Sequence, residues 1–447
     1  MRDRPASGPR VLLYSQRNVY TYMWEVPQAE FEDVILTVDD AELIAPVSWT
    51  TEPRPVSSMS FAGRATRWGR VAAELGGRFL SGVRESAHLP KRWPVGPVTV
   101  DRDYDLFFAT FHFPRNISVV ERLRDVRRRC RTMACFLVEC WTPQIAANRH
   151  YLRLLDQFDH VFLFNAASVR HVQAETTAQC HFLPTAVDAL RFSPFPLDID
   201  RTVDVYNIGR VAPTIHRQLC AMAARDALHY VHATVNHEVP DYLAHRVQVA
   251  NLLKRARYFF AHKINEGRRD ITGGEEALAT RYFEGAASGA VMLGSRPNCK
   301  EFDELFPWPD AVIPVSWDAY DVGAVLRDLD RQPERLARIR RDAVAHSLRT
   351  HDWVHRWGRV LDTVGLAHTP AMRARTSALD TLAGEVAGGR WHDPAREAAL
   401  APSARGLLTD DEADAFDSPR EAVDGVSDLR RSRSRTASPS KHVPRRA

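Results

Sequence analysis

Motifs that define several large enzyme classes are missing from this 447-residue sequence. No GxGxxG follows the first apolar run, Val11 to Ser15, so a dinucleotide-binding dehydrogenase is disfavoured. The sequence contains no Walker A loop, which argues against a P-loop kinase or ATPase. It also contains no GxSxG elbow, which disfavours a hydrolase of the serine type.

Long apolar runs are missing as well. No stretch reaches the roughly 18 apolar residues that a membrane-spanning helix needs. The N-terminal MRDRPASGPR has no apolar centre, so it does not resemble a signal peptide. We therefore expect a cytoplasmic protein.

Lysine is scarce, and an excess of charge of either sign is missing. The chain has 60 basic residues, nearly all of them Arg, and 56 acidic residues, for a net charge of +4. This balance does not indicate a dedicated nucleic-acid binder, so nucleic acid is not an expected partner. We attribute the excess of Arg first to genome composition and only second to phosphate recognition. Arg is distinctive only at sites that use its planar, bidentate geometry.

Three of the six cysteines lie close together in the sequence. Cys130, Cys135 and Cys140 lie five residues apart, which is not a zinc spacing. We expect buried free thiols in a reducing compartment and no metal site.

Apolar runs alternate with helical patterns along two blocks of the chain. In the first block, strands are predicted to begin at Val11, Val34, Asp105, Met133 and His160, with helices over 118–129 and 146–156. The second block contains the strand-like runs VDVYNI, LHYVHA, RYFFA, AVMLG and AVIPV. Helices are predicted there over 214–225, 242–255, 276–288 and 351–366, and two more are predicted within 320–347. Such alternation predicts parallel sheets with crossover helices.

Breaks in this alternation divide the chain. The irregular stretch 46–98, rich in Pro, Ser, Arg and Gly, is predicted to be an excursion on the acceptor side. We predict a first domain over 1–185, a linker over 186–200, a second domain over 201–348, a C-terminal helix over 349–368 and a disordered Arg-, Ser- and Ala-rich tail over 369–447. Two Rossmann-like domains would face each other across a central cleft that holds the ligands.

The stretch Ile271 to Ser295 is the most informative one. Gly273 and Gly274 allow a tight turn before a predicted helix that carries Glu276 and Glu284, eight residues apart and so near one helix face. Two carboxylates there suit the hydroxyls of ribose and sugar, and the free N–H groups of the helix start suit phosphate. The alternative is two solvated glutamates on an amphipathic helix.

RYFEGAASGAVMLGS resembles the donor-binding helix and strand of retaining GT-B glycosyltransferases, with Glu276 and Glu284 matching their E-x7-E pattern. HSLRTHDWVHRWGRVL, with His351 and Arg356, is similar to the end of the glycosyltransferase group 1 domain of CgeB-like spore-coat proteins. LPTAVDALRFSP and YNIGR resemble the linker and first strand of the same domain, so the resemblance covers about residues 158–362. One departure is Ala277-Leu278-Ala279, where Gly-Phe-Gly is usual.

The resemblance implies a GT-B fold, a nucleotide-diphosphate sugar donor and, from E-x7-E, a retaining reaction. It implies that Glu284 binds the donor ribose, and that Glu276 faces the donor sugar or supports its loop. Arg210 would bind the diphosphate, and Lys263 would be a second phosphate cation or else a plain surface lysine. Gly274 and Gly289, at the two ends of this segment, are also predicted to be donor-binding residues. Because cations can balance the leaving diphosphate, we expect no metal and no cofactor.

Two residues at the ends of first-domain strands are candidates for the acceptor side. His112 follows the strand DLFFAT, and Glu139 follows MACFLV. Either side chain could act as a base or a positioning group toward an acceptor hydroxyl, and His112 could instead be a loop or core histidine. Tyr14, Gln16 and Arg17, after the first strand, are weaker candidates. The acceptor itself is not specified by the sequence.

Four functions remain open at this point. The first is a glycosyltransferase that uses a nucleotide sugar. The second is a non-catalytic GT-B-like module that binds a glycan or a protein. An epimerase or phosphorylase on the same fold, and nucleic-acid binding by the tail, are the others. Deletion of all residues after Leu366 is expected to spare donor chemistry.

Overall fold

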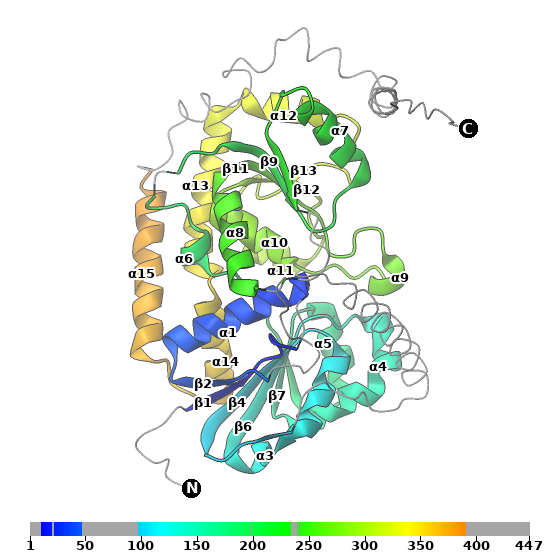
Figure 1. Ribbon diagram of the computed structural model, residues 1–447, viewed down its shortest axis with the longest axis vertical. Helices are drawn as coiled ribbons and strands as arrows, with labels where there is room; N and C mark the ends of the chain where they lie inside the picture. The colour runs from blue at the N-terminus through cyan, green and yellow to red at the C-terminus, as the bar shows by residue number, and fades with distance from the viewer. Residues whose placement is uncertain are drawn as a thin grey trace, which may run out of the picture.

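The computed structural model describes residues 10–19, 22–46, 97–197, 199–233, 239 and 241–389. Most of the predicted excursion, residues 47–96, and the end of the predicted tail, residues 390–447, lie outside the described residues. The described chain forms two α/β units, one above the other in Figure 1, with α1 at their boundary.

The first unit contains a six-stranded parallel sheet in the order β2-β1-β4-β6-β7-β8. Its strands are β1 (Val11–Tyr14), β2 (Ala41–Ile44), β4 (Tyr104–Phe111), β6 (Cys130–Leu137), β7 (His160–Leu163) and β8 (Gln179–Phe182). The central strands are apolar on both faces because helices cover both sides of the sheet. The strands predicted from Val11, Asp105, Met133 and His160 are confirmed.

The strand predicted from Val34 is wrong. These residues are the second half of helix α1 (Val26–Val38). A five-residue run rich in β-branched side chains favours a strand locally. Over the longer window the buried apolar positions Val26, Ala29, Val34 and Val38 recur at helical spacing, and their burial at the domain boundary decides the outcome.

The helix predicted over 118–129 is also corrected. The chain there forms a 3-10 helix, η2 (Pro114–Arg122), then β5 (Leu123–Arg124), then the short helix α3 (Val126–Arg129). Strand β5 pairs with β3 (Val98–Thr99), which interrupts the helical path. The remaining helical elements of this unit are η1 (Met23–Glu25), η3 (Thr142–Gln144), α4 (Ile145–Leu152), η4 (Arg153–Gln157), η5 (Ala166–Ser168) and α5 (Val169–Gln173).

The second unit contains a five-stranded parallel sheet in the order β10-β9-β11-β12-β13. All five predicted strands are present: β9 (Val203–Ile208), β10 (Tyr230–Ala233), β11 (Ala256–Ala261), β12 (Val291–Gly294) and β13 (Ile313–Pro314). Its helices are α7 (Pro213–Ala223), α8 (Tyr242–Arg255), α9 (Arg269–Thr272), α10 (Thr280–Ser288), α11 (Lys300–Leu305), α12 (Val322–Asp330) and α13 (Pro333–Thr350). Along the chain, helix α6 (Ala189–Phe192) lies between the two units.

One helix of the second unit begins later than predicted. Helix α10 starts at Thr280, with Ala279 in an extended conformation before it. Glu276 therefore lies in the preceding loop and does not share a helix face with Glu284.

Each sheet reverses its strand order at one point. In the first sheet β1 lies between β2 and β4, and in the second β9 lies between β10 and β11. In open parallel sheets, ligands bind at the carboxyl ends of the strands beside such a reversal. The residues after β4 and after β9 and β11 are therefore the ones that the topology favours, and these include His112, Arg210 and Lys263.

The two units share one apolar core. A single cluster of buried side chains runs from Leu13 and Phe108 of the first sheet, through Trp353 and Trp357, to Phe283 of α10. Two further clusters fill the opposite faces of the two sheets. Phe31 of α1 stacks on Trp353, with ring centroids 4.6 Å apart. Because the shared core is continuous, the two sheets are held in a defined relative position.

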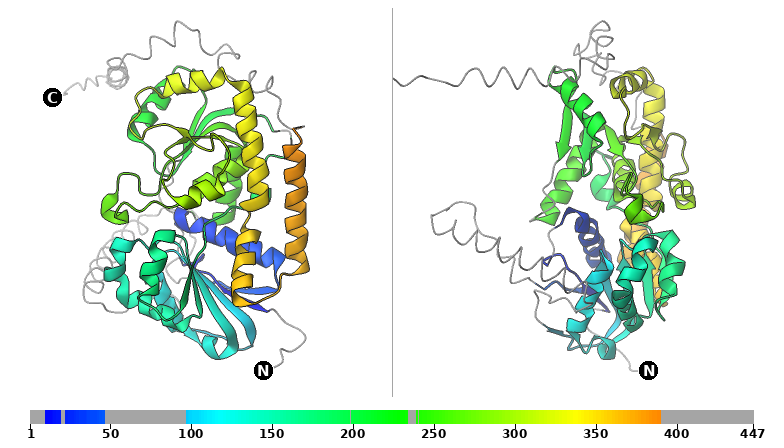
Figure 2. Two further views of the ribbon diagram at one scale, coloured as in Figure 1. Left: turned by 180° about the vertical axis from the view of Figure 1, so that it is seen from behind. Right: turned by 90° about the vertical axis from the view of Figure 1, so that its right-hand side faces the viewer.

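The next helix returns to the first unit, and the last one runs back along α13 of the second unit (Figure 2). Helix α14 (Trp353–Val364) packs on α1, and Trp357 Nε1 donates to Asp39 at 2.7 Å. Helix α15 (Pro370–Ala387) follows, capped by Thr369. Its Arg375 lies 2.7 Å from the carboxylates of both Asp188 and Asp352. The prediction of a disordered tail from residue 369 is therefore wrong for residues 370–387, whose buried Leu379, Ala383 and Val386 join the core.

Candidate functional site

A large pocket opens between the two sheets. It encloses about 1760 Å³ of free space, part of it open to solvent. The pocket brings together five of the eight residues singled out from the sequence: His112 and Glu139 from the first unit, and Arg210, Lys263 and Glu284 from the second. Apolar side chains such as Trp24, Phe164, Trp317 and Trp353 complete the wall.

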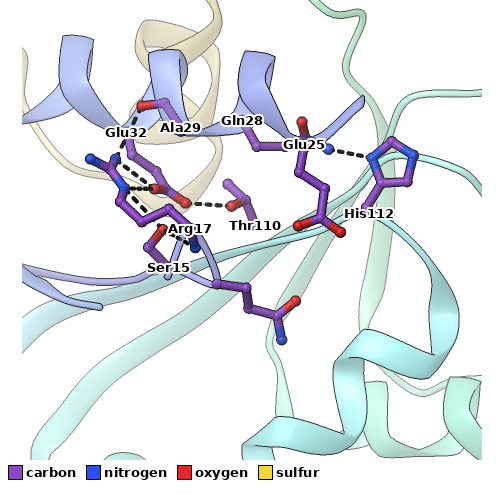
Figure 3. A pocket seen from close by; sticks show the side chains of 9 residues that line it. Ser15, Arg17, Glu25, Gln28, Ala29, Glu32, Thr110 and His112 are labelled. Carbon is purple, nitrogen blue, oxygen red and sulfur yellow. Dashed lines mark hydrogen bonds and ion pairs between the residues drawn. The ribbon is translucent and has the colours of Figure 1, made fainter. Parts of the chain in front are cut away.

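His112 is held at the end of β4 by the Gln28 amide of α1 (Figure 3). When the amide oxygen faces the ring, it accepts from His112 Nδ1 at 2.6 Å, and the amide nitrogen donates to the carbonyls of Trp24 and Glu25 at 3.0 Å. Both ends of the Gln28 amide and His112 Nδ1 are then satisfied, and Nδ1 carries the proton. The buried Nε2 makes no hydrogen bond within the described residues and faces the pocket. Such an orphaned buried nitrogen indicates a ligand position.

Glu139 lies beside His112. Its Oε1 is 3.7 Å from His112 Nε2. Burial by itself would raise the pKa of Glu139, but the His112 ring, with smaller contributions from Trp141 and the charge of Arg210, holds that pKa below its usual value. Glu139 is therefore an ionised carboxylate at neutral pH, placed to orient a hydroxyl or a cationic histidine.

A second hollow next to His112 is filled by an ion-pair network (Figure 3). Arg17 lies 2.7 Å from Glu32 and 2.8 Å from Asp33, and it also donates to Tyr242 of α8. Thr110 donates to the other oxygen of Glu32 at 2.5 Å. Because every group is paired, Arg17 fixes α1 and α8 to each other and is not an open acceptor-side group. Tyr14 is buried in the core of the first sheet.

Besides Arg246, three cations of the second unit line the pocket. Arg210 and Lys263 follow β9 and β11, and Arg281 lies in the first turn of α10. Arg210 donates to Asn265 at 3.0 Å. Arg281 makes no hydrogen bond or ion pair within the described part of the chain, and it lies so close to Gly209 that a Cβ there would be 2.9 Å from Arg281 Nη2.

Helix α10 points its N-terminal end at the same pocket. Ala279, Thr280 and Arg281 line the pocket, and no side chain caps the helix. Uncapped N–H groups and the positive end of the helix dipole attract anions. The cations and the helix end together make this wall electropositive.

Glu284 belongs to a buried charge network that joins the two units. Arg246 of α8 donates through Nη1 to Glu284 and through Nε and Nη2 to Glu30 of α1, at 2.9 and 3.0 Å. Trp353 Nε1 donates to Glu30 at 3.0 Å. Arg246 and Glu30 have no more than 2% of their surface exposed, and Glu284 has 7%. The network thus holds Glu284 as a positioned carboxylate in the pocket wall.

Glu276 and the glycine pair lie just outside this pocket. Lys263 Nζ is 2.7 Å from Glu276 Oε1, and Glu276 also accepts from the Asn298 backbone. Glu276 and Gly274 line a neighbouring hollow. Gly273 and Gly274 have φ of +66° and +93°. A Cβ on Gly273 would lie 2.6 Å from Pro143 of the first unit, which explains the need for glycine there.

Gly289, His351 and Arg356, also named from the sequence, do not line the pocket and make contacts within the fold. Gly289 ends α10 at φ +67°, away from the pocket lining, and its carbonyl accepts from Arg340 at 2.8 Å. His351 is fully buried between Ser347 and the Leu305 carbonyl. Arg356 donates to the carbonyls of Pro184 and Thr185 at 3.2 Å and so fixes the end of the first domain just before the linker.

The sequence reasoning missed four residues of the site. Gln28, Glu30, Arg246 and Arg281 all line the pocket or its charge network. Arg281 lies between Glu276 and Glu284 and carried a usable signal, because a cation at the start of a helix near the predicted phosphate site is unusual. Gln28, Glu30 and Arg246 lie on ordinary helices and gave no such signal.

The sheets, the cleft and the returning C-terminal helices define a GT-B architecture: two Rossmann-like domains with a ligand pocket between them. Residues 210–362 match the family model described as "Glycosyl transferase-like". The match spans most of the second domain and α14, so this part of the chain is similar to that family. No curated protein matches the sequence.

Solved structures with a similar outline share very little sequence. The N-terminal domain of Candida albicans trehalose-6-phosphate phosphatase is 10% identical, with a TM-score of 0.46, over 82% of this chain and 98% of that one. A UDP-forming trehalose-phosphate synthase from Burkholderia vietnamiensis is 10% identical, with a TM-score of 0.46, over 80% and 99%. An α-glucosyltransferase solved with UDP-glucose and DNA is 10% identical, with a TM-score of 0.45, over 80% and 100%. The fold assignment rests on the sheet topology and not on these likenesses.

None of the helices within the described ranges is long and apolar enough to cross a membrane.

Proposed function

We propose that the protein transfers a sugar from a nucleotide-diphosphate sugar to an acceptor hydroxyl. The observation that carries this proposal is the meeting of His112 and Glu139 with Arg210, Arg281 and Glu284 in one pocket between two domains. One wall offers cations to a diphosphate, and the opposite wall offers a base and a carboxylate. A transferred sugar would lie between them.

The proposed donor site rests on the positive charge of one wall of the pocket. Arg210, Arg281 and the N-terminal end of α10 would bind the diphosphate and stabilise the negative charge that grows as it leaves. Since these groups supply the positive charge, the proposal needs no metal ion. Glu284, one oxygen of which is taken by Arg246, would accept from the ribose hydroxyls with the other.

The proposed acceptor site rests on the positions of His112 and Glu139 in the opposite wall. The Nε2 of His112 would contact the transferred sugar or the acceptor hydroxyl, and Glu139 would orient that hydroxyl or stabilise a cationic His112. The E-x7-E resemblance supports retention of configuration at the anomeric carbon. The resemblance to CgeB-like proteins supports the same assignment, and we place the reaction in the cytoplasm.

A non-catalytic binding module is the second candidate. The observation in its favour is the ion pair between Lys263 and Glu276, because it occupies a cation that the resemblance assigns to phosphate. A module of this kind would bind a glycan or a protein in the cleft without turning over a donor.

Thermal-shift screening of the purified protein against nucleoside diphosphates and their sugars tests the donor site. A nucleotide should raise the unfolding temperature of the wild type and of the surface control Glu304→Gln, but not of Glu284→Gln. Glu284→Gln keeps the Arg246–Glu30 pairing and is expected to fold. Donor hydrolysis then separates the two candidates, because a binding module would bind and not hydrolyse. A screen without any stabilising nucleotide would favour the module.

A further inference from the structure

A cluster of metal-ligating side chains lies outside the pocket, at the edge of the second sheet. His216 and Cys220 lie one turn apart on α7, and His232 lies on the edge strand β10. The ligand atoms of the three residues all lie within 4.8 Å of one another. None of the three lines the interdomain pocket. The cluster is therefore independent of the proposed donor site.

The spacing of these atoms fits a tetrahedral metal ion. Zinc binds cysteine sulfur at about 2.3 Å and histidine nitrogen at about 2.0–2.1 Å, which places the two ligand atoms about 3.5 Å apart at a tetrahedral angle. Cys220 Sγ lies 3.6 Å from His216 Nε2. The i,i+4 spacing on α7 places both side chains on one helix face. The rings of His216 and His232 are 4.6 Å apart, so the third ligand needs only a small adjustment.

A neighbouring tyrosine orients one ligand. Tyr230 Oη lies 2.9 Å from His216 Nδ1. When Nδ1–H donates to this oxygen, the proton is fixed on Nδ1 and the lone pair of Nε2 is free for a metal. Metal-bound histidines usually have such a partner on the second ring nitrogen. His232 is exposed, so an ion can reach the cluster from solvent.

We propose that His216, Cys220 and His232 bind one zinc ion. Two imidazoles and one thiolate are the nitrogen and sulfur ligands that zinc prefers. On binding, the Cys220 thiol loses its proton to solvent and the thiolate sulfur bonds to the metal, while water or an external ligand takes the fourth position. The ion ties α7 to the edge strand β10. Because α7 begins three residues after Arg210, the ion also fixes the helix that follows the phosphate-side loop.

Cobalt substitution in the full-length protein tests this site. Co²⁺ bound by a thiolate in a tetrahedral site gives a near-ultraviolet charge-transfer band and strong visible bands, at one equivalent per chain. Cys220→Ser should remove the charge-transfer band, and His232→Ala should weaken zinc binding at least tenfold in competition with a chromophoric chelator. Zinc should raise the unfolding temperature of the wild type and not of Cys220→Ser.

A matched control lies on the first sheet. Cys180 and His181 are adjacent on β8, and His181 Nε2 lies 3.1 Å from His160 Nδ1. Cys180→Ser and His181→Ala should therefore keep the cobalt spectrum and the wild-type zinc affinity. Circular dichroism of each variant shows whether it is folded. A thiolate band that persists in folded Cys220→Ser, or zinc binding that is unchanged when all three residues are replaced, would overturn the proposal.

Discussion

His112 Nε2 lies 3.7 Å from Glu139 Oε1, at the ends of two neighbouring strands, β4 and β6. If the pair serves the acceptor, His112→Ala and Glu139→Gln should each lower turnover by about 10²–10⁴-fold. Nucleotide-induced stabilisation should remain, because both residues lie opposite the phosphate wall. Steady-state kinetics and thermal shift check this, with the exposed Glu121→Gln as a control. Unchanged turnover in both variants would exclude a catalytic or positioning role.

Arg281 provides a prediction about the donor. Arg281→Met should weaken nucleoside-diphosphate binding by roughly 10–100-fold, since a charge-assisted hydrogen bond contributes about 1.5–3 kcal/mol. Gly209→Ala should act in the same direction, because its Cβ would displace Arg281 and because φ is +78°. Isothermal titration calorimetry measures both. Wild-type affinity in Arg281→Met would show that the diphosphate binds elsewhere.

Arg246 provides a prediction about stability. Its removal leaves the buried carboxylates of Glu30 and Glu284 without their shared partner. Arg246→Met should therefore lower the free energy of unfolding by about 3–5 kcal/mol. The exposed Arg127, which pairs with Asp159 at the surface, is the control, and Arg127→Met should change stability little. Urea denaturation compares the two, and equal losses would contradict this interpretation of the network.

The C-terminal helix changes the expectation for truncation. Deletion after Gly389 should leave stability and donor binding at wild-type levels. Deletion after Leu366 removes Arg375 and the buried Leu379, Ala383 and Val386, and should lower the free energy of unfolding by more than about 3 kcal/mol, at roughly 1.5–3 kcal/mol per large buried apolar side chain. Calorimetry of both proteins measures this. A fully stable shorter protein would show that α15 is dispensable.

His262 predicts a pH dependence. Burial, with a contribution from Arg281, lowers the pKa of His262 to about 4. An unfolded histidine titrates near 6.5, so the unfolded state binds more protons between pH 6.5 and 4. Stability should thus fall as the pH falls through this window, by up to about 1.4 kcal/mol per pH unit from this residue. His262→Asn should give a flatter profile in denaturation at several pH values, and an unchanged slope would refute the assignment.

Local patterns predicted much of the fold and part of the site. The alternation of apolar runs with helices gave the two parallel sheets, because strands buried on both faces are apolar throughout. His112 and Glu139 were named because they follow strands β4 and β6, and strand ends in one parallel sheet lie at one edge. Arg210 and Lys263 were named through the resemblance to glycosyltransferases, and both follow strands of the second sheet.

Other features depended on partners distant in sequence. Val34 to Val38 form a helix because their burial against the second domain outweighs their strand propensity. Glu276 lies before the start of α10, not within the predicted helix, and it pairs with Lys263. The composition of residues 370–387 predicted a disordered tail, yet their apolar face packs on the shared core.

The sequence by itself determined the class of the domains and the strand ends from which a site could be built, since both follow from the periodicity of neighbouring residues. Only the tertiary structure decided that Arg246 joins Glu30 to Glu284, residues 254 positions apart, and that Arg281 meets Gly209. Such contacts arise from charges that must be paired when two domains bury a common surface. That requirement acts through space and leaves no periodic signal along the chain.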